Sequence, residues 1–463
     1  MTDIKSLGID ALSDLLEAKA ISPSEILDDV IDRLDVLEPE LNMFAALDIE
    51  GARVCAKAAD ERQMSGGRLS KLDGIPTSIK DLIAQKDLPL RFGSKATSSQ
   101  PAQVDAPSVK RLRAAGAVLL GKSTSSEFGC KAVGDSPLTG ITRNPWDKSK
   151  TPGGSSCGAA AMVGAGLVPY ALGTDGGGSV RIPAALCGLF GIKAQFGRVP
   201  VFPVSATPTL AHVGPLTRSV KDAATVLSMI AGPDFRDPFS IAETAPDYVS
   251  KLGEKRKLKI CWSPTLGFAR PDKEIVEVVS DAVLRLRDLG HDVEQVDHIM
   301  DDPCDMWTAE FYAGVGSKLR GVIENSPNEL DPSVLEVLKK AVTQEMDEYY
   351  ASVFKRYEFR EVMRKFFNRY DVLISPTLPC AAFDVGKDVP DFLSDRTIVS
   401  WVFYTYAFNL TGQPAASVPA GLTKDGLPVG MQLVGRINDE ATILNLSAEF
   451  EEHKGGFETA AST

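Results

Sequence analysis

The chain has 463 residues, of which 44% are hydrophobic and 24% are charged. This composition is typical of globular proteins and provides enough apolar material for a large core. The formal net charge of −12 argues against a nucleic-acid partner, because nucleic-acid binding requires clustered lysines and arginines. No apolar run approaches the roughly 18 residues of a membrane span, so we expect no membrane partner.

Seven cysteines are spread along the chain, and no two of them form a C-x-x-C pair. An odd number of dispersed cysteines predicts reduced thiols rather than a disulfide framework or a zinc site. The first residues form an acidic amphipathic pattern and lack the charged-then-apolar layout of a signal peptide. Together these features predict a cytoplasmic protein without a metal site.

The N-terminal part, residues 1–65, is predicted to be a helical segment that packs on the core. Within it, the sequence SPSE at residues 22–25 indicates a helix start, with a serine cap, a proline in the first turn and a glutamate three residues after the cap. From residue 66 to about 232, glycine and proline are dense, and short apolar strands are expected at 117–120 and 168–172.

Beyond a polar connection at residues 232–255, predicted strands and helices alternate. The expected order is a strand at 258–262, a helix at 272–289, a strand at 291–296, long helices to about 368, a strand at 372–374, a strand region at 412–435 and a helix at 438–453. This alternation predicts a single α/β domain with a mixed sheet. Its core covers residues 66–455, and residues 456–463 form a tail.

Residues 116–123, GAVLLGKS, match the G-x-x-x-x-G-K-[ST] expression of phosphate-binding loops. Such a loop must leave its N–H groups free to wrap a phosphate. Here the middle residues Ala-Val-Leu-Leu are typical of a buried strand, and the residues before them are typical of a helix end. We therefore interpret the segment as a helix end, a glycine cap and a strand, and we do not expect nucleotide binding.

Three segments combine glycine and serine in a way that packing alone does not explain. They are residues 74–81 (GIPTSIKD), residues 151–158 (TPGGSSCG) and residues 173–183 (GTDGGGSVRIP). Consecutive glycines can turn several N–H groups toward one point and let a substrate approach closely. Ser179 ends such a glycine run, where it could attack a carbonyl while neighbouring N–H groups stabilise the oxyanion.

A serine nucleophile needs a base, which is most often histidine. The chain has only four histidines, and none of them stands in a convincing Ser-His-Asp arrangement: His212, His291, His298 and His453. A lysine can do the same work if burial lowers its pKa, so that part of it is neutral. Lys80, at the end of a short apolar strand, is the best candidate.

The second and third segments resemble the amidase signature family, whose pattern runs approximately GGSSGG, a small-residue helix and GTDxGGSxRxP. The intervals also match, with 75 residues from Lys80 to Ser155 and 24 residues from Ser155 to Ser179. Further matching stretches are residues 127–129, 144–146, 188–193, 214–218, 412–415 and 426–430. The resemblance covers roughly residues 5–450 and implies the amidase-signature fold, a large mixed β-sheet sandwiched between α-helices.

The resemblance implies a Ser-cisSer-Lys triad in which Ser179 is the nucleophile, Ser155 relays a proton and Lys80 is the general base. It also implies an oxyanion hole formed by the N–H groups of Gly176, Gly177, Gly178 and Ser179. The residues expected to support this site are Asp175, Arg181, Thr174 and Ser156. No metal or organic cofactor is expected.

Two residues depart from the family pattern. Cys157 stands where glycine is usual, and Gly176 stands where a larger residue is usual. Neither departure removes a catalytic side chain, so they bear on substrate specificity more than on activity.

The leading hypothesis is a stand-alone amidase that hydrolyses a carboxamide C–N bond of a small-molecule amide. The alternative is the glutamine-hydrolysing A subunit of a tRNA-dependent amidotransferase, which shares the triad. That subunit's pattern has Gln in place of Ile182 and Ser-Ser-Leu-Asp-Gln where this chain reads TPTLAH at residues 207–212. Both differences favour the stand-alone enzyme. A binding protein without activity and a nucleotide-binding protein are weaker alternatives.

The substrate pocket is expected to come from variable segments at 126–133, 303–320, 345–355 and 378–405. The candidate pocket residues are Phe128, Gly129, Cys130, Trp307 and Trp401, with Phe311, Tyr349, Phe403 and Tyr404 as further aromatic candidates. An aromatic wall favours an aryl or otherwise apolar acyl group. A homodimer is a possible assembly, because many relatives in the family are homodimers.

Overall fold

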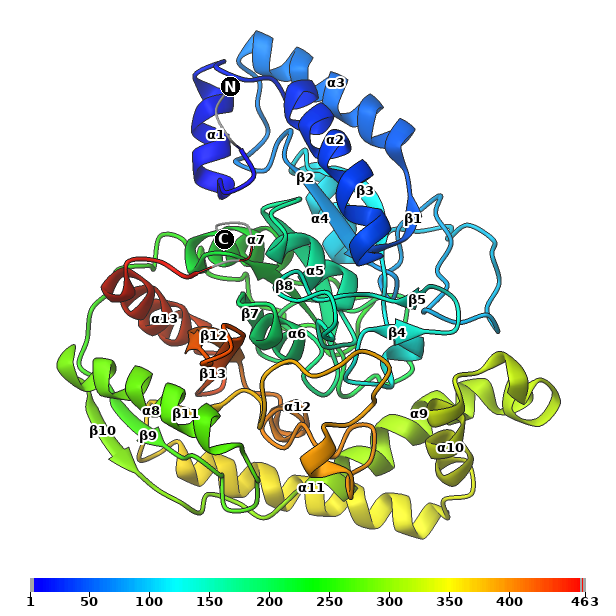
Figure 1. Cartoon of the computed structure of the whole chain (residues 1–463), viewed down its shortest axis with the longest axis vertical. Coiled ribbons are helices and arrows are strands. Elements are labelled where there is room, and N and C mark those ends of the chain that lie inside the picture. The colour runs from blue at the N-terminus through cyan, green and yellow to red at the C-terminus, as the bar shows by residue number, and fades with distance from the viewer. Residues whose placement is uncertain (1–3, 459, 461–463) are drawn as a thin grey trace.

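The computed structural model describes residues 4–458 and 460, and its centre is an eleven-stranded sheet (Figure 1). Across this sheet the strands follow in the order β1 (Phe44–Leu47), β3 (Val118–Ser123), β2 (Pro76–Lys80), β6 (Tyr170–Asp175), β8 (His212–Thr217), β7 (Phe190–Lys193), β12 (Ala415–Leu422), β13 (Pro428–Gly435), β11 (Val372–Pro376), β9 (Lys259–Trp262) and β10 (Asp292–Gln295). A separate ribbon consists of β4 (Asp135–Ser136) and β5 (Gly140–Ile141).

The sheet is mixed. Strands β3, β2 and β6 run parallel to one another, and so do β11, β9 and β10. The strands from β6 through β8, β7, β12 and β13 to β11 pair antiparallel, as does the edge strand β1 with β3. This arrangement confirms the predicted α/β class with a large mixed sheet.

Helices cover both faces of the sheet. They are α1 (Ile9–Glu17), α2 (Pro23–Leu41), α3 (Ile49–Ser65), α4 (Pro107–Ala114), α5 (Cys157–Gly164), α6 (Arg181–Leu186), α7 (Val220–Ile230), α8 (Lys273–Asp288), α9 (Cys304–Asn325), α10 (Pro332–Ala341), α11 (Met346–Phe366), α12 (Ala407–Thr411) and α13 (Glu440–Lys454). Short 3₁₀ turns lie at Glu127–Gly129, Pro327–Glu329 and Asp391–Leu393. Helices α1 to α3 lie at one end of the molecule and α9 to α11 at the other (Figure 1).

The hydrophobic core divides between the two faces, because successive side chains of a strand point to opposite sides. In β11, Val372 and Ile374 join the cluster formed with α1, α4, α7, α8 and α13, whereas Leu373 joins the cluster formed with α9 to α12. In β3, Leu119 joins the first cluster, and its neighbours join a third cluster with α2, α3 and α5. The sheet is therefore buried on both faces.

The N-terminal segment is less purely helical than predicted. The helix start at residues 22–25 is confirmed, since the Ser22 side chain caps α2 and Glu25 completes the capping box. However, α2 ends at Leu41, its C-cap residue Asn42 has a left-handed conformation, and β1 then pairs with β3 as an edge strand of the main sheet. Residues 1–3 of this segment, and residues 459 and 461–463 of the predicted tail, lie outside the described residues.

The segment that matches the phosphate-loop expression is a strand. Residues Val118–Ser123 form the fully buried β3, and the Lys122 ammonium donates to the Ile83 carbonyl rather than facing an open loop. Among residues 4–458 and 460, no helix combines the length and apolarity that crossing a bilayer demands. The seven cysteines are free thiols. The described part of the chain holds no cluster of His, Cys, Asp and Glu side chains suited to a metal ion.

Candidate active site

Lys80 is the last residue of β2, a strand that lies between the parallel strands β3 and β6. Its side chain is fully buried. The Nζ atom lies 2.7 Å from Ser155 Oγ, 2.9 Å from Ser156 Oγ and 2.8 Å from Thr174 Oγ1. The structure therefore brings three other predicted site residues, from two other segments, to the Lys80 amine.

Burial suits this amine to accept a proton. It lowers the pKa of Lys80 from its usual 10.5 to about 7, because the charged form loses its hydration, and the nearby Cys157, Asp175 and Asp81 offset the effect only in part. A neutral amine has two hydrogens to donate and one lone pair that accepts, which suits a site with three hydroxyl partners.

The two predicted catalytic serines face the same cavity. Ser155 follows a cis Gly154–Ser155 peptide bond, and both Ser155 and Ser179 line the cavity. Among the described residues, the Ser179 hydroxyl has no hydrogen-bond partner, whereas its carbonyl accepts the Ser156 N–H at 3.3 Å. The Ser179 hydroxyl is therefore available to a molecule in the cavity.

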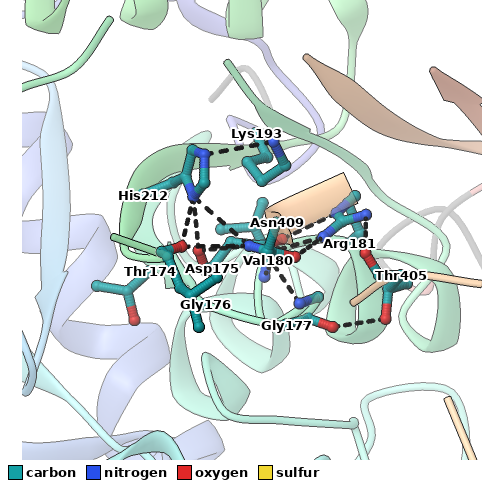
Figure 2. Close-up of polar contacts among 12 residues, drawn as sticks. Thr174, Asp175, Gly176, Gly177, Val180, Arg181, Lys193, His212, Thr405 and Asn409 are labelled. Atoms are coloured by element: carbon teal, nitrogen blue, oxygen red, sulfur yellow. Dashed lines mark hydrogen bonds and ion pairs between the residues drawn. The ribbon is translucent and has the colours of Figure 1, made fainter. Parts of the chain in front are cut away.

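Asp175 and Arg181 form a completely buried ion pair below the glycine loop, residues 176–178. Arg181 Nε and Nη2 donate to the two Asp175 carboxylate oxygens at 3.0 and 2.9 Å, and Asn409 Nδ2 adds a third bond at 2.9 Å (Figure 2). Burial alone would raise the pKa of Asp175, but the Arg181 guanidinium outweighs it and holds that pKa well below its usual value. The pair braces the loop by charge-assisted hydrogen bonds.

The glycine loop uses one of its N–H groups internally. Gly178 N–H, which the resemblance assigns to the oxyanion hole, instead donates to Asp175 Oδ1 at 2.8 Å. Gly178 has a φ of +132°, a conformation that favours glycine, and this turn carries its N–H back toward the carboxylate. The N–H groups of Gly176, Gly177 and Ser179 have no acceptor among the described residues. They are the donors left for an oxyanion.

The cavity beside these groups has a volume of about 320 Å³ and is mostly apolar. Its lining includes the predicted Phe128 and Gly129, and Phe311, Val315 and Leu319 from one face of α9. The remaining apolar lining residues include Leu82, Ile83, Leu90, Phe92, Val201, Phe202 and Val204. The loop at residues 200–207 was not predicted as a wall. Its apolar residues follow no helix or strand period that could have indicated one.

Several predicted pocket residues lie elsewhere. The predicted segments 345–355 and 378–405 contribute no residue to the cavity lining, so the prediction was wrong for Tyr349, Phe403 and Tyr404. The cavity lining does not include Cys130, Trp307 or Trp401, whose side chains are buried in the core cluster of α9 to α12. Trp307 instead donates its indole N–H to the Gly176 carbonyl at 2.7 Å. Large aromatic residues in a variable segment can fill a core as well as a pocket, so composition does not separate the two positions.

His212 lines the cavity, although the sequence did not predict it as a cavity residue. Its Nδ1 lies 2.7 Å from the Leu210 carbonyl and 3.1 Å from the Asp175 carbonyl, so this nitrogen carries the hydrogen (Figure 2). Nε2 then faces Lys193 Nζ at 3.4 Å. Burial and the neighbouring Lys193 lower the pKa of His212 well below its usual value, so the ring is neutral.

The family model for Amidase matches residues 25–444 of the chain. The chain is 37% identical over 440 residues to an acylamidase from Rhodococcus erythropolis, covering 93% of this chain and 92% of that protein. It is 34% identical to the A subunit of a glutamyl-tRNA(Gln) amidotransferase from Chloroflexus aggregans, covering 97% of each chain.

The fold agrees with a solved structure of a bacterial aryl acylamidase, described as an amidase signature enzyme, with a TM-score of 0.92 and 29% identity over 98% of this chain and 97% of that one. The chain therefore belongs to the amidase signature family. It is an amide-hydrolysing enzyme.

Proposed function

We propose that this amidase hydrolyses a neutral, largely apolar carboxamide to a carboxylate and ammonia or an amine, through an acyl-enzyme on Ser179. The observation that carries the proposal is the 2.7 Å contact between the fully buried Lys80 Nζ and Ser155 Oγ, in the cavity that also receives the unpartnered Ser179 hydroxyl. Lysine with a pKa of about 7 can act as a base near neutral pH, so no histidine is required.

In the first half-reaction, Ser179 Oγ attacks the amide carbon as its proton passes to Ser155 Oγ, whose own proton passes to Lys80 Nζ. The carbonyl oxygen becomes an oxyanion held by the N–H groups of Gly176, Gly177 and Ser179. The C–N bond then breaks as the proton returns through Ser155 to the leaving nitrogen. Ammonia or an amine departs, and the acyl group remains on Ser179.

In the second half-reaction, water attacks the acyl carbon and gives its proton to the same Ser155–Lys80 pair. The oxyanion forms again in the same position, and its collapse expels Ser179 Oγ, which recovers the proton. The products are the carboxylate and the original enzyme. Every proton and electron pair is accounted for without a metal or an organic cofactor, so the proposal includes none.

The cavity lining supports a neutral apolar substrate. Of its ionisable side chains, Asp175 is committed to Arg181 and His212 is neutral, which leaves Lys318 at the exposed end of the α9 face. The α-ammonium of glutamine would lose its hydration here without an anionic partner, which costs several kcal/mol. An aryl or alkyl amide instead gains from burial against the apolar wall.

The amidotransferase function remains the alternative, because relatives of that type are 34% identical to this chain. The sequence departures at Ile182 and residues 207–212, together with the apolar cavity, favour the stand-alone enzyme. Residues 207–212 end in His212, a cavity residue, so this departure lies in the region that contacts substrate.

The test is ammonia release by the purified chain and by Ser179→Ala, with aliphatic, aryl and indolyl amides and with glutamine. We expect the wild type alone to turn over apolar amides, with a chelator leaving its rate unchanged. Turnover of glutamine only, or dependence on added partner proteins, would favour the amidotransferase function. Equal activity in Ser179→Ala would refute the acyl-enzyme.

We also propose that the enzyme acts in the cytoplasm on a small molecule, without a nucleic-acid partner, and as a homodimer. The free thiols suit a reducing compartment, and the net charge of −12 opposes contact with nucleic acid. We further propose that residues 1–65 and the core at 66–455 unfold as one domain, because β1 belongs to the main sheet. A single calorimetric transition would support this.

A further inference from the structure

The glycine loop is held at its carbonyl oxygens. In a trans peptide, the C=O of one residue and the N–H of the next point in opposite directions, so a donor that holds the carbonyl also directs the following N–H. The only cis bonds among the described residues lie outside this loop, at residues 154–155 and 202–203. Each loop carbonyl can therefore be followed to the N–H group that it directs.

Four successive carbonyls have such a donor. Asn409 Nδ2 and His212 Nδ1 lie 3.0 and 3.1 Å from the Asp175 oxygen (Figure 2). The Trp307 indole donates to the Gly176 oxygen at 2.7 Å, and the Thr405 hydroxyl donates to the Gly177 oxygen at 2.6 Å. The Ile182 N–H donates to the Gly178 oxygen at 2.6 Å. Except for Ile182, these donors lie outside the three segments that combine glycine and serine, residues 74–81, 151–158 and 173–183.

The same residues occupy the space beside the loop. A Cβ on Gly177 would lie 2.6 Å from the Trp307 ring, and one on Gly178 would lie 2.4 Å from Thr405 Oγ1. A Cβ on Gly176 would lie 2.8 Å from Phe311, which stacks on Trp307 with ring centroids 4.4 Å apart. This packing explains why Gly176 departs from the larger residue usual in the family, since Phe311 fills that space.

We propose that Trp307 and Thr405 are positioning residues for amide hydrolysis, which hold the glycine loop so that its free N–H groups face the oxyanion. Trp307 directs the Gly177 N–H by holding the Gly176 carbonyl. Thr405 holds the Gly177 carbonyl, which keeps the Gly178 N–H on Asp175 and the turn before Ser179 in place. The proposal rests on the Ser179 mechanism proposed above.

The test compares substitutions that remove the donor with substitutions that keep it. Thr405→Val removes the hydroxyl and keeps the side-chain shape, whereas Thr405→Ser keeps the hydroxyl. Trp307→Phe removes the indole N–H, and Trp401→Phe is its control, because Trp401 is equally buried and its indole nitrogen has no partner among the described residues. Thermal unfolding of each variant reports the cost of lost packing.

We expect Thr405→Val and Trp307→Phe to lower kcat by about ten- to hundred-fold while KM changes little, since the loop N–H groups act on the transition state. Thr405→Ser and Trp401→Phe should stay within about two-fold of the wild-type kcat. Binding of phenylboronic acid, which forms a tetrahedral adduct with a serine, should weaken in parallel with kcat, whereas benzoate binding should not.

The proposal is overturned if Thr405→Val keeps the wild-type kcat, or if Thr405→Ser loses as much as Thr405→Val. The Thr405 pair decides the question even if Trp307→Phe does not fold. Failure of the Ser179 mechanism would look different, because Ser179→Ala would then remain active. If Ser179→Ala is inactive while Thr405→Val and Trp307→Phe keep full activity, the positioning proposal is refuted and the Ser179 mechanism still stands.

Discussion

The glycine loop and the cavity wall meet at Ser179, yet they are built from different interactions. In the loop, the carbonyls and the Gly178 N–H have directed partners, above the Asp175–Arg181 pair, and these bonds leave the N–H groups of Gly176 and Gly177 free. In the wall, Phe128, Phe311 and their neighbours present apolar surface with few hydrogen bonds. Directed bonds place atoms accurately, whereas apolar contacts fix only shape and size. The proposed mechanism therefore assigns the reaction to the loop and the choice of amide to the wall.

The largest effect should come from Ser179, the proposed nucleophile in the loop. Ser179→Ala is expected to lower kcat by at least about 10⁴-fold, because the variant cannot form the acyl-enzyme. The melting temperature should stay close to wild type, since the Ser179 hydroxyl has no partner among the described residues to lose. Steady-state kinetics and thermal unfolding check both parts. A large loss of stability would mean that the hydroxyl has a structural role.

Removal of Lys80, the proposed base, should have the next largest effect. Lys80→Met is expected to lower kcat by about 10³-fold or more. In the wild type, only the neutral amine accepts a proton, so kcat/KM should rise with pH through about 7, where Lys80 loses its proton, and level off above it. A pH–rate profile measures this. A profile that is flat from about pH 5.5 to about pH 8.5 would contradict lysine as the base.

Removal of the Asp175–Arg181 ion pair below the glycine loop should lower the stability of the fold. Arg181→Met leaves the Asp175 carboxylate buried without its cation, which we expect to destabilise the fold by about 3–5 kcal/mol. Urea unfolding measures this change. The matched control is Arg270→Met, which breaks the exposed pair with Asp395 and should change stability little. Equal effects in the two variants would show that the buried pair does not brace the loop.

The smallest effect should come from the wall, and it should depend on the substrate. Val315→Phe narrows the apolar cavity and is expected to lower kcat/KM for an aryl amide by about ten-fold or more, while acetamide is affected little. If kcat/KM falls for the aryl amide only, the substitution has narrowed the cavity without damaging the catalytic residues. If both fall together, the substitution has disturbed the loop rather than the wall.

The sequence predicted the loop better than the wall for a physical reason. A glycine run that ends in serine, and a lysine after an apolar strand, are local patterns whose residue types the chemistry itself requires. The same reasoning correctly rejected residues 116–123 as a phosphate loop, because a strand pattern is also local. It failed for β1, since a four-residue strand between helices depends on its partner β3.

By itself, the sequence determined the family, the α/β class and the residues that meet at Lys80, because the motifs and their spacing carry this information. Only the tertiary structure decided that Gly178 N–H binds Asp175, that Trp307 holds the loop and that residues 200–207 line the cavity. Each of these depends on where distant segments come to lie, and the direction of an N–H group or a ring is set by contacts that no local pattern encodes.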